Sequence, residues 1–449
     1  MDASLNAISP VDGRYRKTTA PLAGFFSEAA IIKYRTFVEV EYLIALAKIL
    51  PPLNIIKGDT VKKLRGIVQH FSFDDAVTVK KIEATTNHDV KAIEYFVKEK
   101  LDGMGLEKIR EFVHFGLTSQ DINNTAFPLA MRDSWEQLMK PALLAIHHKI
   151  LSDSSTWMNI PMLAHTHGQA ASPTLLGKEM YVFVERLQHQ VMQLNTIPFT
   201  GKFGGAVGNF NAHVVAYPEI DWPAFANNFL KKSLGLERQH PTTQIEHYDH
   251  LAAFFDGIKR INNIFIDLDR DLWMYISMNY FKQKVKAGET GSSTMPHKVN
   301  PIDFENSEGN LGIANALFEH FSSKLPVSRL QRDLTDSTVI RNIGVAFAHT
   351  LIGWTSLLKG LDKVVVNETR LKEDLENNWA VVSEAIQTIL RRENYPEPYE
   401  ALKSLTRGKT GITQKSMQRF IDGLKLSNKV KEELKRITPH NYTGVIDIP

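Results

Sequence analysis

Hydrophobic side chains recur at steps of three and four residues along much of the chain, which is the period of amphipathic helices. The longest such run lies between Pro241 and Pro296, a stretch with no other proline. Its apolar positions are Leu251, Phe254, Phe255, Ile258, Ile261, Phe265, Leu268, Leu272 and Ile276. A helix of about 30 residues would be about 45 Å long, too long to wrap a compact globule. The pattern therefore predicts an elongated helical bundle.

Two shorter runs repeat this period, one at residues 176–194 and one at residues 311–325. Strand signals are scarce, and the best of them, Val364–Val366, is short. Strands and helices do not alternate, which disfavours an α/β sheet enzyme. We expect an all-α fold with an elongated central helical bundle flanked by two smaller helical domains. The expected boundaries give an N-terminal helical domain at 1–105, a central long-helix bundle at 106–362 and a C-terminal helical domain at 363–449.

The composition narrows the possible functions. The 449 residues include 43% hydrophobic and 23% charged side chains, and a net charge of +3 gives no broad basic field for nucleic acid. Cysteine is absent, which excludes disulfides, thiolate catalysis and cysteine-ligated metals. Residues 1–17 lack the apolar core of a signal peptide, and no apolar run reaches the roughly 18 residues of a membrane span. We expect a cytoplasmic protein, enzyme or scaffold, without membrane or nucleic-acid partners.

The segment Gly291–Pro301 carries the strongest chemical signal. It begins with a glycine hinge and adjacent hydroxyls, and it continues through His297 and Lys298 to Asn300. Asn is a strong N-cap and Pro suits the first helical position, so a helix should begin here. A helix N-terminus attracts anions, and Lys298 adds a positive charge. One interpretation is a flexible lid that carries a serine to a carboxylate; the other is a surface loop whose hydroxyls only satisfy turns.

The residue order of this segment resembles the serine loop of the fumarase/aspartase superfamily. Its Met295–Pro301 form looks most like the adenylosuccinate lyase family of the longer bacterial type, and the resemblance runs from Ser9 to Tyr442. It implies β-elimination of fumarate from adenylosuccinate, giving AMP, and from the succinylated aminoimidazole carboxamide ribotide of purine biosynthesis. It also implies that no metal or other cofactor is needed. A homotetramer with active sites shared between subunits is implied as well.

His165-Thr166-His167-Gly168-Gln169 is the second informative segment. Two histidines one residue apart could be metal ligands, or they could simply be satisfied by hydrogen bonds. Pro173 and the long helix expected after it place the pair on a loop. The segment resembles the general-acid segment of the family. That resemblance implies that His167 protonates the leaving nitrogen.

The resemblance assigns the other catalytic roles as well. Ser292 would remove the proton beside the carboxylate. Lys298, the Asn300 amide and the helix N-terminus would stabilise the charge that develops there. A free serine is a weak base, so nearby charge and exclusion of water must activate it. Glu305 aligns with the family carboxylate that orients the acid histidine.

Several further segments resemble substrate-binding blocks of the family. Asp89 precedes a helical run, and in isolation it would more simply be an N-cap. Thr118 and Ser119 resemble a block that holds a carboxylate at a helix start. The window 329–341 offers arginines and hydroxyls for phosphate, although a charged helix face would look similar. The substrate contacts that the resemblance implies are Arg14, Tyr15, Asn87, His88, Asp89, Thr118, Ser119, Gln169, Gln244, Ser293, Val299, Asn300, Asn306, Arg332, Ser337, Thr338, Val339, Ile340 and Arg341.

Other functions stay open at this point. A sister lyase such as argininosuccinate lyase would share the serine loop, although His297 and the 329–341 window disfavour it. A helical scaffold could keep the fold without activity, although all four catalytic residue types are present. A metallohydrolase built on the histidine pair is a third alternative. An ATPase is excluded, because Gly201–Gly205 lacks the Ser or Thr that a phosphate loop needs after its lysine.

Overall fold

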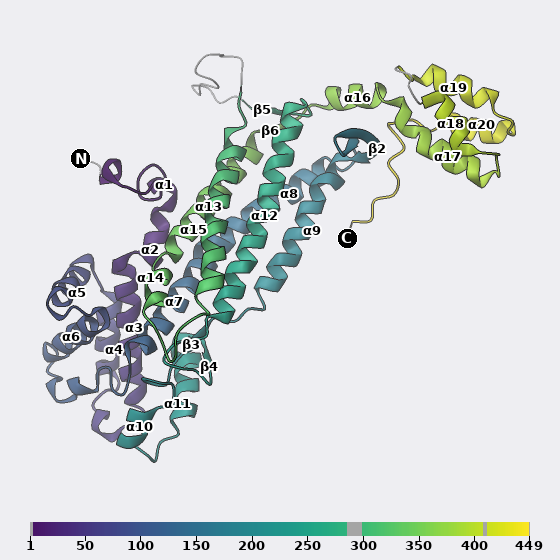
Figure 1. Ribbon diagram of the computed structural model, residues 1–449. Coiled ribbons are helices and arrows are strands. Elements are labelled where there is room, and N and C mark those ends of the chain that lie inside the picture. The colour runs from purple at the N-terminus through teal and green to yellow at the C-terminus, as the bar shows by residue number, and fades with distance from the viewer. Residues whose placement is uncertain (1–2, 285–298, 407–410, 449) are drawn as a thin grey trace. The chain divides into compact units, whose positions relative to one another are not determined.

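Figure 1 shows the fold of the chain, a computed structural model that describes residues 3–284, 299–406 and 411–448. The α-helices are α1 (Arg16–Thr19), α2 (Ala23–Phe26), α3 (Glu28–Leu46), α4 (Asp59–Gln69), α5 (Phe73–Thr86), α6 (Asp89–Asp102), α7 (Ser119–Ser134), α8 (Lys140–Thr156), α9 (Leu176–Leu194), α10 (Asn211–Ala216), α11 (Trp222–Asn228), α12 (Asp249–Ser277), α13 (Ile302–Lys324), α14 (Thr335–Ile340), α15 (Ile343–Lys363), α16 (Glu368–Glu376), α17 (Ser383–Arg392), α18 (Pro398–Thr406), α19 (Gln414–Gly423) and α20 (Asn428–Lys435). Short 3-10 or π segments are η1 (Ala3–Asn6), η2 (Ala20–Leu22), η3 (Pro51–Leu53), η4 (Glu107–Phe112), η5 (Trp135–Met139), η6 (Phe229–Leu234) and η7 (Trp379–Val382). The strands are β1 (Pro161–Thr166), β2 (Gln169–Leu175), β3 (Thr200–Lys202), β4 (Glu237–Gln239), β5 (Phe281–Gln283) and β6 (Val364–Val366).

Helices dominate the described residues, and this confirms the all-α class. The apolar periodicity placed the long helices correctly, since α12, α9 and α13 cover the three runs. The start of α13 differs slightly from the prediction. The Pro301 carbonyl accepts the N–H of Glu305 at 3.4 Å, so Pro301 takes the N-cap position expected for Asn300 and the helix begins at Ile302. No described helix is both long enough and apolar enough to cross a membrane.

The contacts within the chain define two compact units. The first unit comprises 1–143, 190–263 and 309–355, and the second comprises 144–189, 264–308 and 356–449. Several long helices contribute residues to both units. The three-domain division at 1–105, 106–362 and 363–449 stays a prediction.

The first unit is built around α3, which packs against α4, α6 and α7. Tyr42 of α3 is fully buried, and its ring lies within 5.3 Å of the ring of Phe203 and 5.6 Å of that of Phe229. The parts of α12, α13 and α15 in this unit meet through aromatic rings, since Phe318 contacts both Phe255 and Phe347. Burying each such ring contributes about 1.5–3 kcal/mol. These buried rings therefore stabilise the first unit and the helices that form it.

In the second unit the segment expected as a loop is an antiparallel hairpin of β1 and β2, in which Thr166 pairs with Gln169. The two residues between them, His167 and Gly168, have φ values of 55° and 72°. A two-residue type I′ turn requires positive φ at both central positions, which Gly adopts freely. The strand predicted at Val364–Val366 is confirmed as β6, which pairs with β5.

Candidate active site

The candidate residues fall in both units. His167, Gln169, Val299, Asn300, Glu305 and Asn306 belong to the second unit, and those numbered up to 119, Gln244 and those from 332 to 341 belong to the first. The predicted base Ser292, its neighbour Ser293 and the predicted cation Lys298 lie outside the described residues.

His167 stands at the tip of the β1–β2 hairpin with an exposed side chain. Its left-handed backbone is uncommon for a residue with a side chain, and such conformations concentrate at functional sites. The hairpin is fixed on its β2 side, because the Ser172 hydroxyl donates to the Glu384 carboxylate, which also accepts from the Tyr442 hydroxyl at 3.1 Å. The imidazole is therefore carried by an anchored turn, which suits a group that must deliver a proton to one place.

Glu305, predicted to orient His167, is exposed on α13 and accepts a hydrogen bond from Trp273 Nε1 at 3.0 Å. No hydrogen bond joins Glu305 to His167 among the residues that the structure describes. Beside it, the Asn306 amide donates to Ser356 Oγ at 3.1 Å. The pairing of Glu305 with the acid histidine stays a prediction.

The Asn87–Asp89 segment is the junction of two helices in the first unit. Asn87 ends α5 in the left-handed conformation, with φ of 50°. The N-cap of α6 is His88, whose Nδ1 accepts the N–H of Lys91 at 3.1 Å. The sequence suggested Asp89 as that cap. Asp89 instead occupies the first helical position, which leaves its carboxylate available for other partners.

The Asp89 carboxylate joins two arginines from distant parts of the sequence. Its Oδ2 lies 2.9 Å from a guanidinium nitrogen of Arg35 and 2.9 Å from one of Arg341, while Oδ1 accepts the N–H of Val90 at 2.8 Å. Burial opposes ionisation of this carboxyl, but Arg35, the Val90 N–H and Arg341 together outweigh it and hold its pKa below the usual range. Asp89 is therefore an anion at neutral pH, and it brings the 87–89 and 332–341 segments together.

The 332–341 window is a short helix with an arginine near each end. Arg332 donates to Ser337 Oγ at 2.8 Å, and Arg341 caps the C-terminus of α14. Thr338 is exposed, whereas the Ile340 side chain is buried. Arg341 also lines a cavity of about 280 Å³ to which the N-terminal segment contributes Arg16. That volume approaches the roughly 300–1,000 Å³ of ordinary ligand pockets.

The remaining candidate contacts of the first unit lie at segment ends. Arg14 is exposed, and Tyr15 is the N-cap residue of α1. The Gln244 amide donates to the carbonyl of Ala206 at 3.0 Å. Whether these three residues contact a substrate stays a prediction.

Thr118 and Ser119 do form a helix start, since α7 begins at Ser119. Asp121, three residues after Thr118, accepts the Thr118 N–H at 2.8 Å. The same carboxylate lies 2.8 Å from Lys202 Nζ, and both side chains are fully buried. Lys202 therefore belongs to an internal ion pair that supports this helix start, in agreement with the rejection of a phosphate loop around it.

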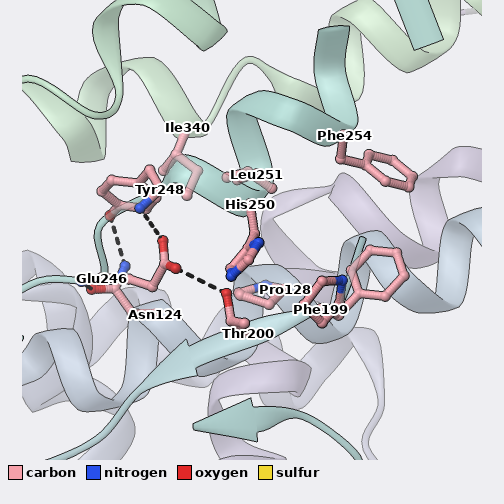
Figure 2. A pocket seen from close by; sticks show the side chains of 11 residues that line it. Asn124, Pro128, Phe199, Thr200, Glu246, Tyr248, His250, Leu251, Phe254 and Ile340 are labelled. Carbon is pink, nitrogen blue, oxygen red and sulfur yellow. Dashed lines mark hydrogen bonds between the residues drawn. The ribbon is translucent and has the colours of Figure 1, made fainter. Parts of the chain in front are cut away.

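A buried hydrogen-bonded chain links Thr200, Glu246, Tyr248 and Asn124 (Figure 2), and Tyr248 extends it to Asp336 of the 332–341 window. The Tyr248 hydroxyl donates to Asp336 Oδ2 at 2.9 Å and accepts from the Asn124 amide at 2.7 Å. The Glu246 carboxylate accepts from Thr200 Oγ1 at 2.9 Å and from the Tyr248 N–H. The cavity among these side chains measures about 20 Å³, which is far too small for a nucleotide. This region is therefore a support for the site.

Burial raises the pKa of Glu246 to about 7, although its bonds to Thr200 and Tyr248 oppose the shift. An unfolded glutamate has a pKa of about 4.3, so between these values the native chain holds a proton that the unfolded chain releases. The free energy of unfolding must then fall as pH rises through this window, by up to about 4 kcal/mol. We expect Glu246→Gln to raise the unfolding temperature relative to wild type more at pH 8 than at pH 5.

Thermal unfolding at both pH values and one protein concentration measures this effect. Glu237→Gln is the control, because Glu237 is exposed on β4 and its substitution should act equally at both pH values. An equal Glu246→Gln difference at pH 5 and pH 8 would contradict the raised pKa.

Arg35, Lys202, Tyr248 and Asp336 were not predicted as parts of the site. Arg35 offered one signal, because it and Lys33 are the two cations within the largely apolar run Ala29–Val40 of α3. A cation placed among buried positions needs a fixed anionic partner. The sequence alone does not identify that partner, since Asp89 lies in another helix.

Comparison with known proteins identifies the family. A family model described as lyase matches residues 13–314, and one described as adenylosuccinate lyase C-terminal matches residues 328–443. The adenylosuccinate lyase of Dictyostelium discoideum is 57% identical across 99% of this chain and 97% of its own. The chain belongs to the adenylosuccinate lyase family. The Escherichia coli K12 adenylosuccinate lyase agrees, with 49% identity across 98% of this chain and 97% of its own.

The family assignment confirms the expectation drawn from the serine loop, and it establishes the chain as a lyase. Among solved structures, a fumarate lyase from Mesorhizobium sp. BNC1 matches with a TM-score of 0.76 and 17% identity over 95% of both chains. A β-carboxy-cis,cis-muconate cycloisomerase from Acinetobacter calcoaceticus matches with a TM-score of 0.70 and also 17% identity, over 95% of both chains. This chain therefore has the same fold as these two structures.

Proposed function

We propose that this chain releases fumarate from adenylosuccinate, giving AMP, and from the succinylated aminoimidazole carboxamide ribotide. A proton leaves the carbon next to the succinyl carboxylate for Ser292, and the carbon–nitrogen bond breaks as the double bond of fumarate forms. His167 gives a proton to the departing nitrogen. Lys298 and the Asn300 amide stabilise the negative charge that develops on the carboxylate.

The observation that carries this proposal is the Asp89 bridge. It joins Asn87–Asp89, which resembles a substrate-binding block of the family, to the Arg341 guanidinium proposed to hold phosphate, at 2.9 Å. Arg332 and Ser337, already hydrogen-bonded to each other at 2.8 Å, supply a second cation and a hydroxyl for the nucleotide. Arginine forks and hydroxyls are the groups that recognise phosphate in proteins. A substrate that carries a phosphate, as a nucleotide does, fits this arrangement.

The same proposal includes a cytoplasmic homotetramer with active sites shared between subunits. The long helices supply support, since several large apolar side chains on them are exposed: Met192 on α9, Trp273 and Met274 on α12, and Ile313 on α13. Helices of neighbouring subunits would bury such side chains in a common bundle. Sedimentation of the purified protein as a monomer would contradict this part of the proposal.

The direct test mixes purified protein with adenylosuccinate and follows fumarate by proton NMR. We expect fumarate and AMP in equal amounts. A parallel sample with argininosuccinate separates the sister activity, and it should yield no fumarate. Fumarate from argininosuccinate but not from adenylosuccinate would replace the proposed function with that of the sister lyase.

A further inference from the structure

Arg35 is a buried cation at the centre of the first unit, with only 1% of its side chain exposed. A buried guanidinium is costly unless anions and hydrogen-bond acceptors surround it. Two such partners are present. Its Nη2 lies 2.9 Å from Asp89 Oδ2, and its Nε donates to Asn123 Oδ1 at 2.8 Å. Burial lowers the pKa of this arginine and Asp89 opposes the shift, but a guanidinium stays protonated in proteins.

Directly or through Asp89, Arg35 is connected to three different candidate substrate segments. Asp89 lies in the 87–89 segment, and Asn123 lies on α7, one turn after its start at Ser119. Asp89 also forms an ion pair with Arg341, the last residue of the 332–341 window. Residues distant in the sequence are thus held by one side chain of α3, which itself has no exposed surface to offer a substrate.

The charges of this cluster balance. Arg35 and Arg341 are cations, and Arg341 lies 3.4 Å from the Glu28 carboxylate as well as 2.9 Å from Asp89. Lys80 lies 3.4 Å from Glu28 and 2.6 Å from Glu83. Without Arg35, the carboxylates of Asp89, Glu28 and Glu83 would face only two cations, Arg341 and Lys80, and the excess negative charge would repel an incoming phosphate. With Arg35 in place, Asp89 is neutralised from the buried side, so Arg341 retains positive charge for a ligand.

The geometry points to Arg35 as a positioning residue for the substrate phosphate, and this inference rests on the proposed function. Arg35 fixes the Asp89 carboxylate, and Asp89 holds the Arg341 guanidinium at the edge of the 280 Å³ cavity. A free arginine loses about 2 kcal/mol of rotamer entropy when it is immobilised. An Arg341 side chain already held by Asp89 avoids much of that loss when phosphate binds.

The test compares Arg35→Lys with wild type. Lysine keeps the charge but cannot bond Asp89 and Asn123 together, because it lacks the planar fork. We expect the KM for adenylosuccinate and the inhibition constant of AMP each to rise about tenfold, with kcat within about twofold, since the phosphate contact acts equally on ground state and transition state. Arg35→Met, which also removes the charge, should raise both constants further.

Two control variants separate positioning from general damage. Arg65→Lys makes the same exchange in another ion pair of α3, where Arg65 bonds both oxygens of Glu41 at 2.7 and 2.9 Å. Thr36→Val alters the fully buried neighbour of Arg35, whose hydroxyl donates within the helix to Ile32. Both controls should leave the KM and the AMP inhibition constant within about twofold of wild type, whatever they do to thermal stability.

A double-mutant cycle tests the route through Arg341. If Arg35 acts by holding Arg341, then Arg35→Lys added to Arg341→Met should change AMP binding by less than twofold. Additive effects would overturn the inference, as would a lower unfolding temperature with unchanged KM, or a fall in kcat alone.

If the Arg35 variants do not fold, Asn123→Ala keeps the buried ion pair between Arg35 and Asp89 and removes only the hydrogen bond to α7. It should raise KM about threefold, and an unchanged KM would overturn the inference.

The inference and the proposed function fail in different ways. Wild-type protein that releases no fumarate and binds no AMP in calorimetry would overturn both. Wild-type protein that does both, with Arg35→Lys binding AMP equally well, would overturn only the role of Arg35.

Discussion

Replacement of His167 by alanine is expected to lower the rate of fumarate release at least about 10³-fold while the protein remains folded. Positioned proton transfer accounts for about 10²–10⁴-fold in enzymes, and expulsion of a nitrogen anion without a proton donor is especially unfavourable. His167 is exposed at the tip of its hairpin, so its loss creates no cavity in a core. Fumarate formation by NMR and the thermal unfolding temperature together measure this result.

The left-handed backbone of His167 calls for a second variant. Alanine is strained at a φ of 55°, by about 1–2 kcal/mol, whereas asparagine tolerates that conformation. His167→Asn therefore keeps the turn and removes only the imidazole, and it should be as inactive as His167→Ala. His165→Ala is the matched control, since His165 lies exposed on the same hairpin and should keep most of the activity. Near-normal rates in His167→Asn would contradict the acid role.

The histidine pair also decides a remaining alternative. In a metallohydrolase both His165 and His167 would be ligands, so both variants would lose activity and a chelator would abolish it. No group of three or more His, Asp or Glu side chains lies close enough to hold a metal ion within residues 3–284, 299–406 and 411–448. Loss of activity in His165→Ala together with loss on chelation would favour that alternative.

The parts of the fold that could be predicted are the long helices, because their apolar residues repeat at a regular spacing along the sequence. Helix α12 was expected from its apolar positions alone, because a stripe repeated over 29 residues leaves little alternative. The β1–β2 hairpin was missed for a physical reason. Its turn is His167-Gly168, not one of the Asn-Gly or Asp-Gly pairs that announce such turns, and its strands contain few β-branched residues.

In the candidate site, too, features set by neighbouring residues could be predicted, whereas contacts between residues far apart in the sequence could not. The helix start near Thr118 was readable, since a hydroxyl followed three residues later by an acid is a local signal. At the next junction the sequence suggested Asp89 as the cap, and His88 is the cap instead. Asp89 is drawn away by Arg35 and Arg341, and no local rule anticipates partners that come from other helices.

Lys202→Met is expected to destabilise the protein by about 3–5 kcal/mol, the usual result when one partner of a buried ion pair is removed. Lys202 Nζ lies 2.8 Å from Asp121 Oδ1, and neither side chain is exposed. Without the ammonium group, Asp121 would keep only backbone N–H donors, namely those of Thr118, Gly204 and Gly205.

A second substitution separates the charge from the packing. Asp121→Asn combined with Lys202→Met removes the uncompensated charge, yet the asparagine oxygen still accepts backbone N–H groups, so most of the lost stability should return.

Lys259→Met is the control, because it removes the cation of an ion pair at the surface. Lys259 bonds to Asp256 at 3.0 Å and also to Glu319, all three side chains are at least partly exposed, and such pairs contribute about 0–1 kcal/mol each. The measurement is the thermal unfolding temperature at one protein concentration. An unfolding temperature for Lys202→Met no lower than that of Lys259→Met would contradict this expectation. That result would mean that the buried ion pair does not stabilise the helix start at Thr118. Structural relaxation or a water molecule would then have compensated the charge of Asp121.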